Sequence, residues 1–223
     1  MAVRSHVSNA VQDYAKAIWS LAQRGDLPVS TSALADRLEV SPASASAMVK
    51  RLESMGLVEH EPYHGVQLTP AGERVALEVL RHHRLLELYL AEALGMSWDR
   101  VHEEAEVLEH AISPALSDLI AAKLGNPTHD PHGDPIPTAD GEIDETPTRA
   151  LADLEPGARG SFVRVSDSDP DMLRYLADRG IAPGDRFEVL AREPFEGPLT
   201  VVFGERSHVL GGALTHAMRT VAE

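Results

Sequence analysis

The chain has 223 residues, a formal net charge of −15 and no cysteine. Without cysteine it has no disulfide, no thiolate metal ligand and no cysteine nucleophile, and its length predicts two or three small domains rather than one. The excess of acid argues against a protein that coats nucleic acid by charge alone, because phosphate contacts are made largely by Lys and Arg.

The negative charge is unevenly distributed along the chain. Residues 1–72 carry six Lys or Arg and seven Asp or Glu, whereas the rest of the chain carries fourteen and twenty-eight. The first third is therefore nearly neutral and can face DNA.

No apolar run is long enough to span a membrane, and the first residues lack the apolar core of a signal peptide. We therefore expect a cytoplasmic protein that does not interact with membranes.

The first third of the chain has the element order of a winged helix-turn-helix. Ser30 or Thr31 can cap a short helix, and Ser41 can cap the next one, with Pro42 at its first position. A turn with Pro and Gly separates two short apolar stretches, which is typical of a β-hairpin. The predicted elements are helices at 8–23, 31–38 and 42–55 and strands at 57–60 and 66–68.

The rest of the chain predicts a helical domain followed by a small β domain. Helical periodicity favours helices at 70–93, 98–110 and 113–124. A Pro-, Gly- and Asp-rich stretch follows and is predicted to be a linker, and about 75 residues of short strands with one helix at 170–179 then indicate a small barrel. The predicted fold is α+β and multidomain: a winged helix-turn-helix at 1–73, a helical domain at 74–126, a linker at 127–148 and an SH3-like β-barrel at 149–223.

The stretch VHEEAEVLEH at 101–110 is the most unusual of the sequence. On a helix, His102, Glu106, Glu109 and His110 share an arc of roughly 100°, and no Lys or Arg stands between residues 100 and 123 to balance them. Grouped carboxylates repel one another unless they are protonated or bind a metal. This pattern predicts a site for a divalent first-row metal such as Mn²⁺, Fe²⁺ or Zn²⁺.

A second pair with the same chemistry precedes this stretch. His83 and Glu87 stand four residues apart on the predicted 70–93 helix, so both project from one face toward a neighbouring element. The alternative is that all these side chains are solvated and the histidines incidental, which is the better interpretation of any single His. Enzymatic motifs are missing: the helices at 74–124 contain no HExxH or Glu-x-x-His pairs, and the chain has no Gly-rich phosphate loop or GxSxG. We therefore do not expect an enzyme.

Four motifs in this order resemble the DtxR family of metal-dependent transcriptional repressors, including its manganese-responsive MntR branch. They are QDYAKAIWSL at 12–21, HHRLLELYL at 82–90, VHEEAEVLEH at 101–110 and HGDPIP at 132–137. The resemblance spans essentially the whole chain. It implies a homodimer in which a divalent metal controls binding to double-stranded operator DNA, and a barrel of the SH3-like or FeoA-like kind.

The resemblance also implies two sets of metal ligands. The primary site would use Asp13 from the first helix with Glu106, Glu109 and His110. The ancillary site would use His83, Glu87 and His102, and the barrel would add Asp169 or Asp171 to it.

Ligand hardness favours manganese over iron. Iron-responsive members of the family have a cysteine at the position of Glu106 and a methionine at that of Asp13, whereas both positions here carry oxygen donors, as in the manganese-responsive members. Lys16 departs from the manganese-responsive members, which have a glutamate there, so a closely spaced pair of metals is not expected. We expect Mn(II) as the main cofactor, with Fe(II) or another divalent transition metal as the alternative, and no organic cofactor.

For DNA, the resemblance makes 42–54 the recognition helix. Its first turns are small and polar and can approach the major groove closely, whereas its basic residues are better placed for phosphates. The wing tip can touch the DNA backbone. The predicted DNA-binding residues are Ser41, Pro42, Ser44, Ser46, Lys50, Arg51, Tyr63 and His64.

The function implied is a metal-dependent repressor of metal-uptake genes. Two alternatives from other classes stay open at this point. One is a metal-independent winged-helix regulator that senses an organic ligand, and the other is a metal-dependent hydrolase.

Overall fold

The computed structural model describes residues 7–223 except 24, 26, 62, 63, 145 and 196. The chain forms two compact units. The first contains residues up to His82 together with Pro137–Glu142, and the second contains His83–Ile136 together with Ile143–Glu223.

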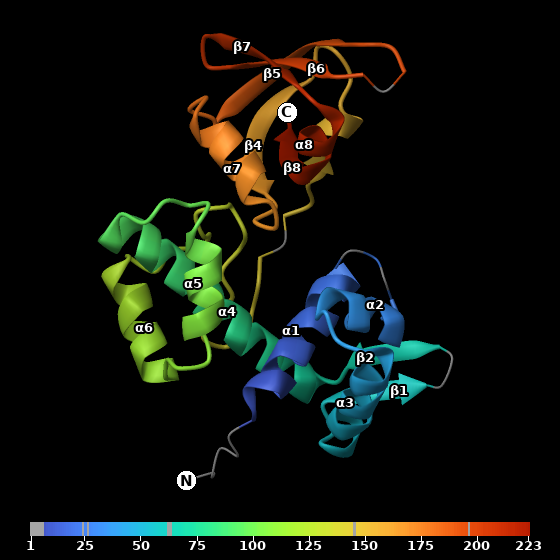
Figure 1. The fold of residues 1–223 in the computed structure, drawn as a ribbon. Coiled ribbons are helices and arrows are strands. Elements are labelled where there is room, and N and C mark those ends of the chain that lie inside the picture. The colour runs from blue at the N-terminus through green and yellow to red at the C-terminus, as the bar shows by residue number, and fades with distance from the viewer. Residues whose placement is uncertain (1–6, 24, 26, 62–63, 145, 196) are drawn as a thin grey trace. The chain divides into compact units, whose positions relative to one another are not determined.

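The first unit contains the winged helix-turn-helix (Figure 1). Its helices and strands pack around one apolar core that includes Ile18, Leu34, Leu52 and Val66. The two strands pair antiparallel, and Val29 forms an isolated bridge with Val66 beside them. The elements are α1 (Asn9–Gln23), α2 (Thr31–Arg37), α3 (Pro42–Ser54), β1 (Val58–Glu61) and β2 (Gly65–Leu68).

Serine caps fix where α2 and α3 begin. The Ser30 hydroxyl accepts from the backbone N–H of Ala33 at 3.0 Å, and the Ser41 hydroxyl accepts from that of Ser44 at 3.1 Å. Each bond satisfies one of the N–H groups that a helix start leaves without a partner. Both caps and the position of Pro42 at the start of α3 match the sequence prediction.

One long helix, α4 (Pro70–Leu94), extends from the first unit into the second. Its second half packs with α5 (Val101–Leu108) and α6 (Pro114–Lys123) around Leu85, Ala105 and Ile120. The helix α5 begins three residues later than predicted, because residues 98–100 form a turn.

The segment after α6, predicted as a linker, contains no helix or paired strand over its described residues up to Thr148 apart from an isolated bridge between His129 and Pro135, but part of it is tightly packed. The carboxylate of Asp130 accepts from the backbone N–H groups of His132 at 2.8 Å and Asp134 at 2.9 Å. Asp130, His132 and Ile136 are buried. Pro, Gly and Asp here build a folded turn rather than a flexible connection.

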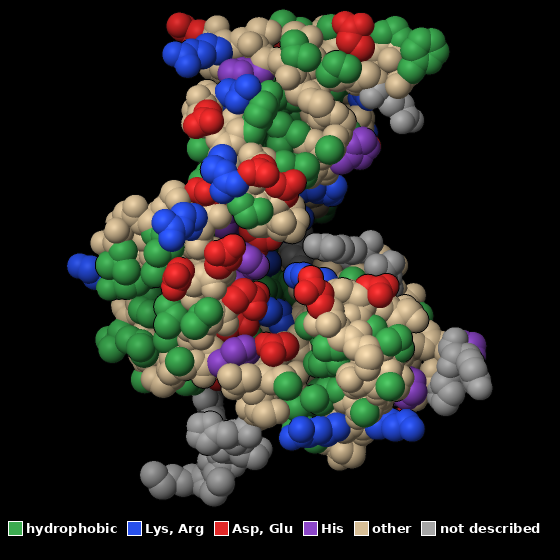
Figure 2. All heavy atoms as spheres, in the orientation of Figure 1, with side chains coloured by type: hydrophobic (Ala, Val, Ile, Leu, Met, Phe, Trp, Pro, Cys, Tyr) green, Lys and Arg blue, Asp and Glu red, His purple; other side chains and the backbone are tan. Residues whose placement is uncertain are grey.

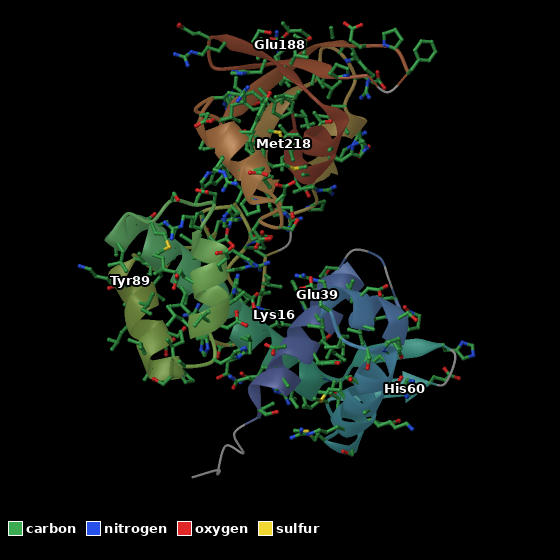
Figure 3. All side chains as sticks on the ribbon, in the orientation of Figure 1. Lys16, Glu39, His60, Tyr89, Glu188 and Met218 are labelled. Carbon is green, nitrogen blue, oxygen red and sulfur yellow. The ribbon has the colours of Figure 1, made fainter. Side chains whose placement is uncertain are left out.

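The second unit also contains a six-stranded antiparallel sheet with the strand order β3-β8-β4-β5-β6-β7. Its core includes Phe162, Leu176, Val201 and Met218, and Figure 3 shows Met218 inside this domain and Glu188 at its outer edge. The elements are β3 (Arg149–Ala150), the 3-10 turn η1 (Leu151–Asp153), β4 (Arg159–Val165), α7 (Pro170–Ala177), β5 (Arg186–Arg192), β6 (Leu199–Phe203), β7 (Arg206–Leu210), α8 (Gly212–Ala217) and β8 (Met218–Ala222).

The short helix α8 was not predicted. The sequence analysis assigned β character to all of residues 208–221, yet Gly212–Ala217 is helical between two strands. Leu214 and Thr215 are buried on this helix, so packing against the sheet outweighs the local preference.

Gly133 provides a test of the packed turn. Its φ is +86°, and a Cβ at this position would lie 1.9 Å from the carbonyl oxygen of Val163 on β4. Gly157 is the matched control, since its φ is +92° and nothing lies within 4 Å of a Cβ there. We expect Gly157→Ala to cost about 1 kcal/mol of unfolding free energy through the backbone alone, and Gly133→Ala to cost roughly 1–3 kcal/mol more through the clash. Thermal unfolding of both variants measures this difference, and equal losses would contradict it.

Candidate metal centre and DNA-binding surface

The candidate metal centre is built around two side chains of α4. His83 and Glu87 lie one turn apart, so they share a face, and both are buried. The Nε2 atom of His83 is 3.0 Å from Oε1 of Glu87. The helix α4 thus holds an imidazole and a carboxylate together, and both lie away from water in the folded chain.

The helix α5 adds His102 to this pair. Its Nδ1 atom lies 3.1 Å from Nε2 of His83 and 3.3 Å from Oε1 of Glu87. Three donor atoms therefore converge with separations near 3 Å. Donor atoms bound at roughly 2.1 Å around one octahedral ion have this spacing, so the three atoms have the geometry of a metal site.

The SH3-like domain supplies a fourth donor, Asp167, in the loop after β4. Its Oδ2 atom is 2.9 Å from Nδ1 of His102. The residues predicted from this domain, Asp169 and Asp171, have other roles: the Asp169 carboxylate caps α7 by accepting from the backbone N–H groups of residues 171 and 172, and Asp171 is exposed and pairs with Arg174. The carboxylate brought to the cluster therefore comes two to four residues earlier than predicted.

The sequence analysis did not predict Asp130 and His132 as ligands. Together with Glu87 they form a second group of buried metal-ligand residues whose ligand atoms lie within 4.8 Å of one another. The Nδ1 atom of His132 is 3.8 Å from Oε2 of Glu87 and, in the described part of the chain, has no hydrogen-bond partner. Each carboxylate oxygen of Glu87 thus faces at least one histidine. The sequence signal for Asp130 and His132 was DPHG, a stretch with Pro and Gly that also carries two residue types able to bind a metal.

The end of α5 brings a further carboxylate to the other side of His83. Glu109 follows the last residue of the helix, and its Oε2 atom is 2.6 Å from Nδ1 of His83. Oε1 of Glu106 is 3.8 Å from the same nitrogen, and His110 Nε2 is 3.5 Å from Oε1 of Glu109. Asp13 lies on α1 in the first unit.

The close packing of imidazoles and carboxylates shifts the pKa values of His102 and Glu87. Contacts with the carboxylates of Asp167 and Glu87 raise the pKa of His102 to about 10, despite its burial. Burial disfavours the charge on Glu87, but the nearby imidazoles of His102, His132 and His83 outweigh it and hold the pKa of Glu87 well below its usual range. The imidazoles thus carry the positive charge that the carboxylate needs.

The pKa of Asp130, in the loop after α6, shifts in the opposite direction to that of Glu87. Burial, followed by the charges of Asp134 and Glu87, raises the pKa of Asp130 well above its usual range. Burial lowers the pKa of His132, but Glu87, Asp130 and the carbonyl of Trp98 together outweigh burial and raise that pKa to about 9. Burial thus favours the neutral form of Asp130, whereas the contact with Glu87 favours the charged form of His132.

The candidate DNA-binding surface is the exposed side of α3. Its buried side carries Ala45, Val49 and Leu52, so Lys50 and Arg51 face outward. The Ser41 and Ser44 hydroxyl groups lie 2.9 Å apart, and both residues are exposed, as is Pro42. The Ser46 hydroxyl donates to the carbonyl of Pro42 at 2.8 Å.

The wing carries the other predicted DNA contacts. His64 is exposed before β2, whereas Tyr63 lies outside the described residues. Figure 2 shows Lys and Arg side chains on the winged-helix part of the face drawn.

Comparisons with known proteins cover every domain. Residues 6–66 match the N-terminal DNA-binding domain of iron-dependent repressors, residues 69–138 match their metal-binding and dimerisation domain, and residues 149–217 match the FeoA domain. The iron-dependent repressor IdeR of Mycobacterium leprae is 30% identical over 219 residues, which cover 92% of this chain and 94% of that protein. This chain belongs to the DtxR family of metal-dependent transcriptional repressors.

Two further proteins are similar to this chain over nearly its whole length. The diphtheria toxin repressor of Corynebacterium glutamicum is 30% identical over 217 residues, 92% of this chain and 93% of that protein. A solved structure of a manganese-dependent transcriptional repressor in complex with manganese is 45% identical, has a TM-score of 0.89 and covers 96% of this chain and 100% of that chain. The predicted family, the repressor function and the α+β fold with a winged helix, a helical domain and an SH3-like domain are confirmed.

None of the described helices of this DtxR-family repressor is long and apolar enough to cross a membrane.

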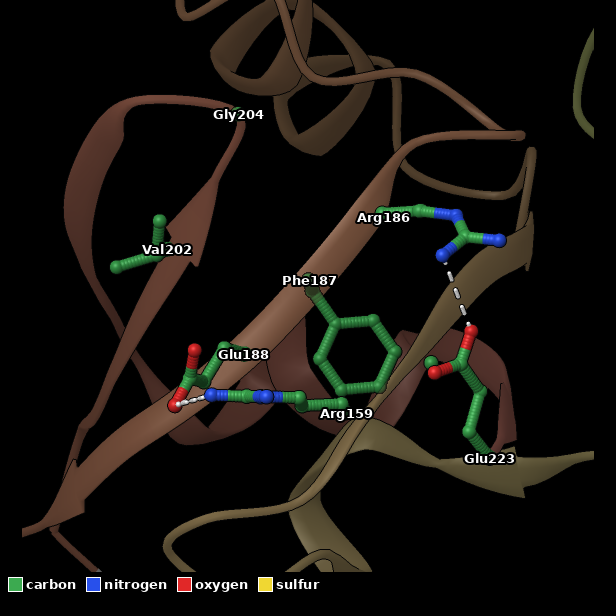
Figure 4. A pocket seen from close by; sticks show the side chains of 8 residues that line it. Arg159, Arg186, Phe187, Glu188, Val202, Gly204 and Glu223 are labelled. Carbon is green, nitrogen blue, oxygen red and sulfur yellow. Dashed lines mark hydrogen bonds and ion pairs between the residues drawn. The ribbon is translucent and has the colours of Figure 1, made fainter.

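A surface hollow in the SH3-like domain is lined by two ion pairs, Arg159 with Glu188 at 2.9 Å and Arg186 with Glu223 at 3.3 Å (Figure 4). These charges balance each other, and none of the candidate metal ligands lines the hollow.

The two aspartates of the loop before α7 separate the observed arrangement from the predicted one. We expect Asp167→Ala to weaken Mn²⁺ binding by roughly 10-fold or more, since a carboxylate donor is lost. Asp169→Ala removes a helix cap and lowers the unfolding free energy by about 1 kcal/mol without changing the affinity for metal. Calorimetric titration and thermal unfolding of both variants measure the two effects, and metal binding that depends on Asp169 instead would overturn the assignment.

Proposed function

We propose that this repressor is activated by Mn²⁺ and, as a homodimer, then binds operator DNA in the cytoplasm. The observation that supports it best is the convergence of His83, Glu87, His102 and Asp167, whose contacting nitrogen and oxygen atoms lie 2.9–3.3 Å apart. All of these donors are imidazole nitrogens or carboxylate oxygens, and the chain has no cysteine. Such a donor set suits Mn²⁺ and does not offer the thiolate that softer metals favour.

The proposal includes two metal sites. The primary site uses Asp13, Glu106, Glu109 and His110, as the resemblance implies. The second site is centred on Glu87, whose Oε1 faces His83 and His102 and whose Oε2 faces His132. Asp167 and Asp130 complete the second site, and the buried Nδ1 of His132, which has no hydrogen-bond partner among the described residues, supports the presence of a cation there.

DNA binding depends on the primary site because its ligands come from two parts of the chain. Asp13 belongs to α1 of the winged helix-turn-helix, whereas Glu109 and His110 follow α5 of the helical domain. A bound divalent ion supplies the charge that lets these carboxylates approach one another. Asp13 then holds the winged helix in one orientation on the dimer, so both recognition helices reach half-sites about one turn of DNA apart.

The dimer contact is proposed on α5 and α6. Val107 and Leu119 are 74% and 68% exposed, and Leu108 and Leu116 are also exposed. Exposed leucine and valine side chains at neighbouring helical positions mark an interaction surface more often than a solvated one. The match of residues 69–138 to a dimerisation domain supports a second copy of the chain as the partner.

On DNA, we propose that α3 enters the major groove. Ser41, Pro42 and Ser44 approach the base edges at its start, and Lys50 and Arg51 contact phosphates. Ser46 already bonds to the carbonyl of Pro42, so its hydroxyl contributes less than those of the other two serines. His64 and Tyr63 on the wing contact the backbone.

The choice of Mn²⁺ over Fe²⁺ rests on ligand hardness. Among the relatives, IdeR is described as iron-dependent, whereas a structure 45% identical to this chain is described as manganese-dependent. Glu106 and Asp13 carry carboxylates where iron-responsive members carry a cysteine and a methionine. The two alternatives, a regulator that senses an organic ligand and a hydrolase, have no comparable support. The genes that we expect this protein to repress are genes for metal uptake.

Metal-dependent DNA binding is the direct test of this function. In mobility-shift assays with promoter DNA of metal-uptake genes, we expect Mn²⁺ to raise the affinity of the wild type by roughly 5- to 150-fold. Glu106→Ala and His110→Ala should lose this response because each removes a primary ligand. Glu103→Ala, an exposed carboxylate on the same helix, is the matched control and should respond normally. Metal-independent binding by all four proteins would overturn the mechanism.

The metal preference can be tested by exchanging two donors. We expect Asp13→Met combined with Glu106→Cys to shift activation of DNA binding from Mn²⁺ toward Fe²⁺, because a thioether and a thiolate replace two hard oxygens. The measurement is the metal concentration for half-maximal DNA binding, under anaerobic conditions, with the single variants as controls. An unchanged ratio of the two concentrations would contradict the role of donor hardness.

A further inference from the structure

The turn between α4 and α5 contacts the SH3-like domain at two neighbouring residues. Trp98 packs against the apolar core cluster of that domain. The carboxylate of Asp99 accepts from Nη1 of Arg174 on α7 at 2.9 Å. Burial raises the pKa of Asp99, but this contact and hydrogen bonds from Ser97 and the backbone together outweigh burial and lower it. The turn is therefore one of the places where the helices hold the SH3-like domain.

Trp98 also makes two contacts with His132. The Nε2 atom of His132 is 2.7 Å from the carbonyl oxygen of Trp98. The two rings stack, with centroids 5.9 Å apart and planes inclined by 19°. The carbonyl restrains one edge of the imidazole and the indole restrains its plane, so the ring of His132 has little freedom to turn.

The contact with the carbonyl decides what the other nitrogen can do. A carbonyl oxygen only accepts, so Nε2 of His132 carries a hydrogen. Its Nδ1 atom is then the edge presented to Oε2 of Glu87, at 3.8 Å. For a metal-binding histidine, the partner of the second nitrogen fixes both tautomer and orientation.

We propose that Trp98 is a positioning residue of the second metal site, one that holds His132 with Nδ1 toward Glu87 while the SH3-like domain holds Trp98. This inference rests on the second site of the proposed function. It gives the SH3-like domain two roles at that site: Asp167 contributes a donor directly, and the apolar core of the domain keeps the indole stacked on His132. Metal affinity and attachment of the domain are then linked through one side chain.

Substitutions of Trp98 in the full chain test this role. Trp98→Leu keeps an apolar side chain but removes the ring plane, and we expect it to weaken Mn²⁺ binding at the second site about 10- to 100-fold. Trp98→Phe keeps an aromatic face and should stay within about threefold of the wild type. Binding at the primary site should be unchanged in both. Calorimetric titration with Mn²⁺ measures the two classes of site, and Glu87→Gln identifies the second class by its loss.

A spectroscopic signal distinguishes positioning from simple packing. The chain has two tryptophans, so Trp19→Phe leaves Trp98 as the only one. In this background Mn²⁺ should change the emission of Trp98 as the second site fills, and Glu87→Gln should abolish the change. Asp99→Asn weakens the neighbouring contact with Arg174 without altering the stacking, and should shift the metal affinity less than Trp98→Leu does.

The outcomes separate the two levels of the proposal. If Trp98→Leu lowers thermal stability equally with and without metal and leaves the affinity unchanged, Trp98 only packs and the inference is overturned. If wild type and Glu87→Gln bind the same number of ions, the second site itself is wrong. Weaker binding by Trp98→Leu, rescue by Trp98→Phe and a metal-dependent Trp98 signal together support the positioning role.

Discussion

The burial of Glu87 is the constraint on which much of the second unit depends. A carboxylate that is 1% exposed is costly to keep ionised unless positive charge or hydrogen-bond donors surround it. Its neighbours are three histidines, from α4 itself, from α5 and from the loop after α6. Each of these elements is thereby tied to one charged group, and each histidine is a residue that can exchange its proton for a metal.

The loop after α6 connects the surroundings of Glu87 to the SH3-like domain, because it contacts both α4 and β4. The Oδ1 atom of Asp134 lies 3.3 Å from both Arg84 on α4 and Arg164 on β4. The carbonyl of His132 accepts from the backbone N–H of Val165 at 2.9 Å, and Gly133 leaves no room for a side chain against β4. Helix, loop and strand therefore form a continuous set of polar contacts, and displacement of any one of them would leave buried charges without partners.

The sequence predicts local features of this arrangement better than distant ones. Spacing of four residues on a helix is enough to place His83 beside Glu87 and His102 on the same face as Glu106. Serine caps likewise mark the starts of α2 and α3. By contrast, Asp167 reaches His102 only through the packing of a separate domain, so nothing local marks it as a ligand. Asp169 before Pro170 carries the same cap signal as Ser41 before Pro42.

The loop and α8 show a second kind of limit. Pro, Gly and Asp are as frequent in flexible linkers as in packed turns, and only the burial of Asp130 and His132 separates the two cases. Helix α8 has six residues, too few for periodicity to outweigh the strands on either side. Both features are decided by tertiary contacts, which composition and spacing do not report.

His83 connects the two proposed metal sites. Its Nε2 atom faces Glu87, and its Nδ1 atom faces Glu109, at 3.0 and 2.6 Å. An imidazole that ligates a metal through one nitrogen keeps its hydrogen on the other and donates it to a carboxylate. When Nε2 of His83 serves the second site, Nδ1 therefore donates to Glu109 and orients a ligand of the primary site. In the proposed mechanism, in which the primary site controls the winged helix, filling of the second site would therefore favour the DNA-binding form without contacting the DNA-binding domain.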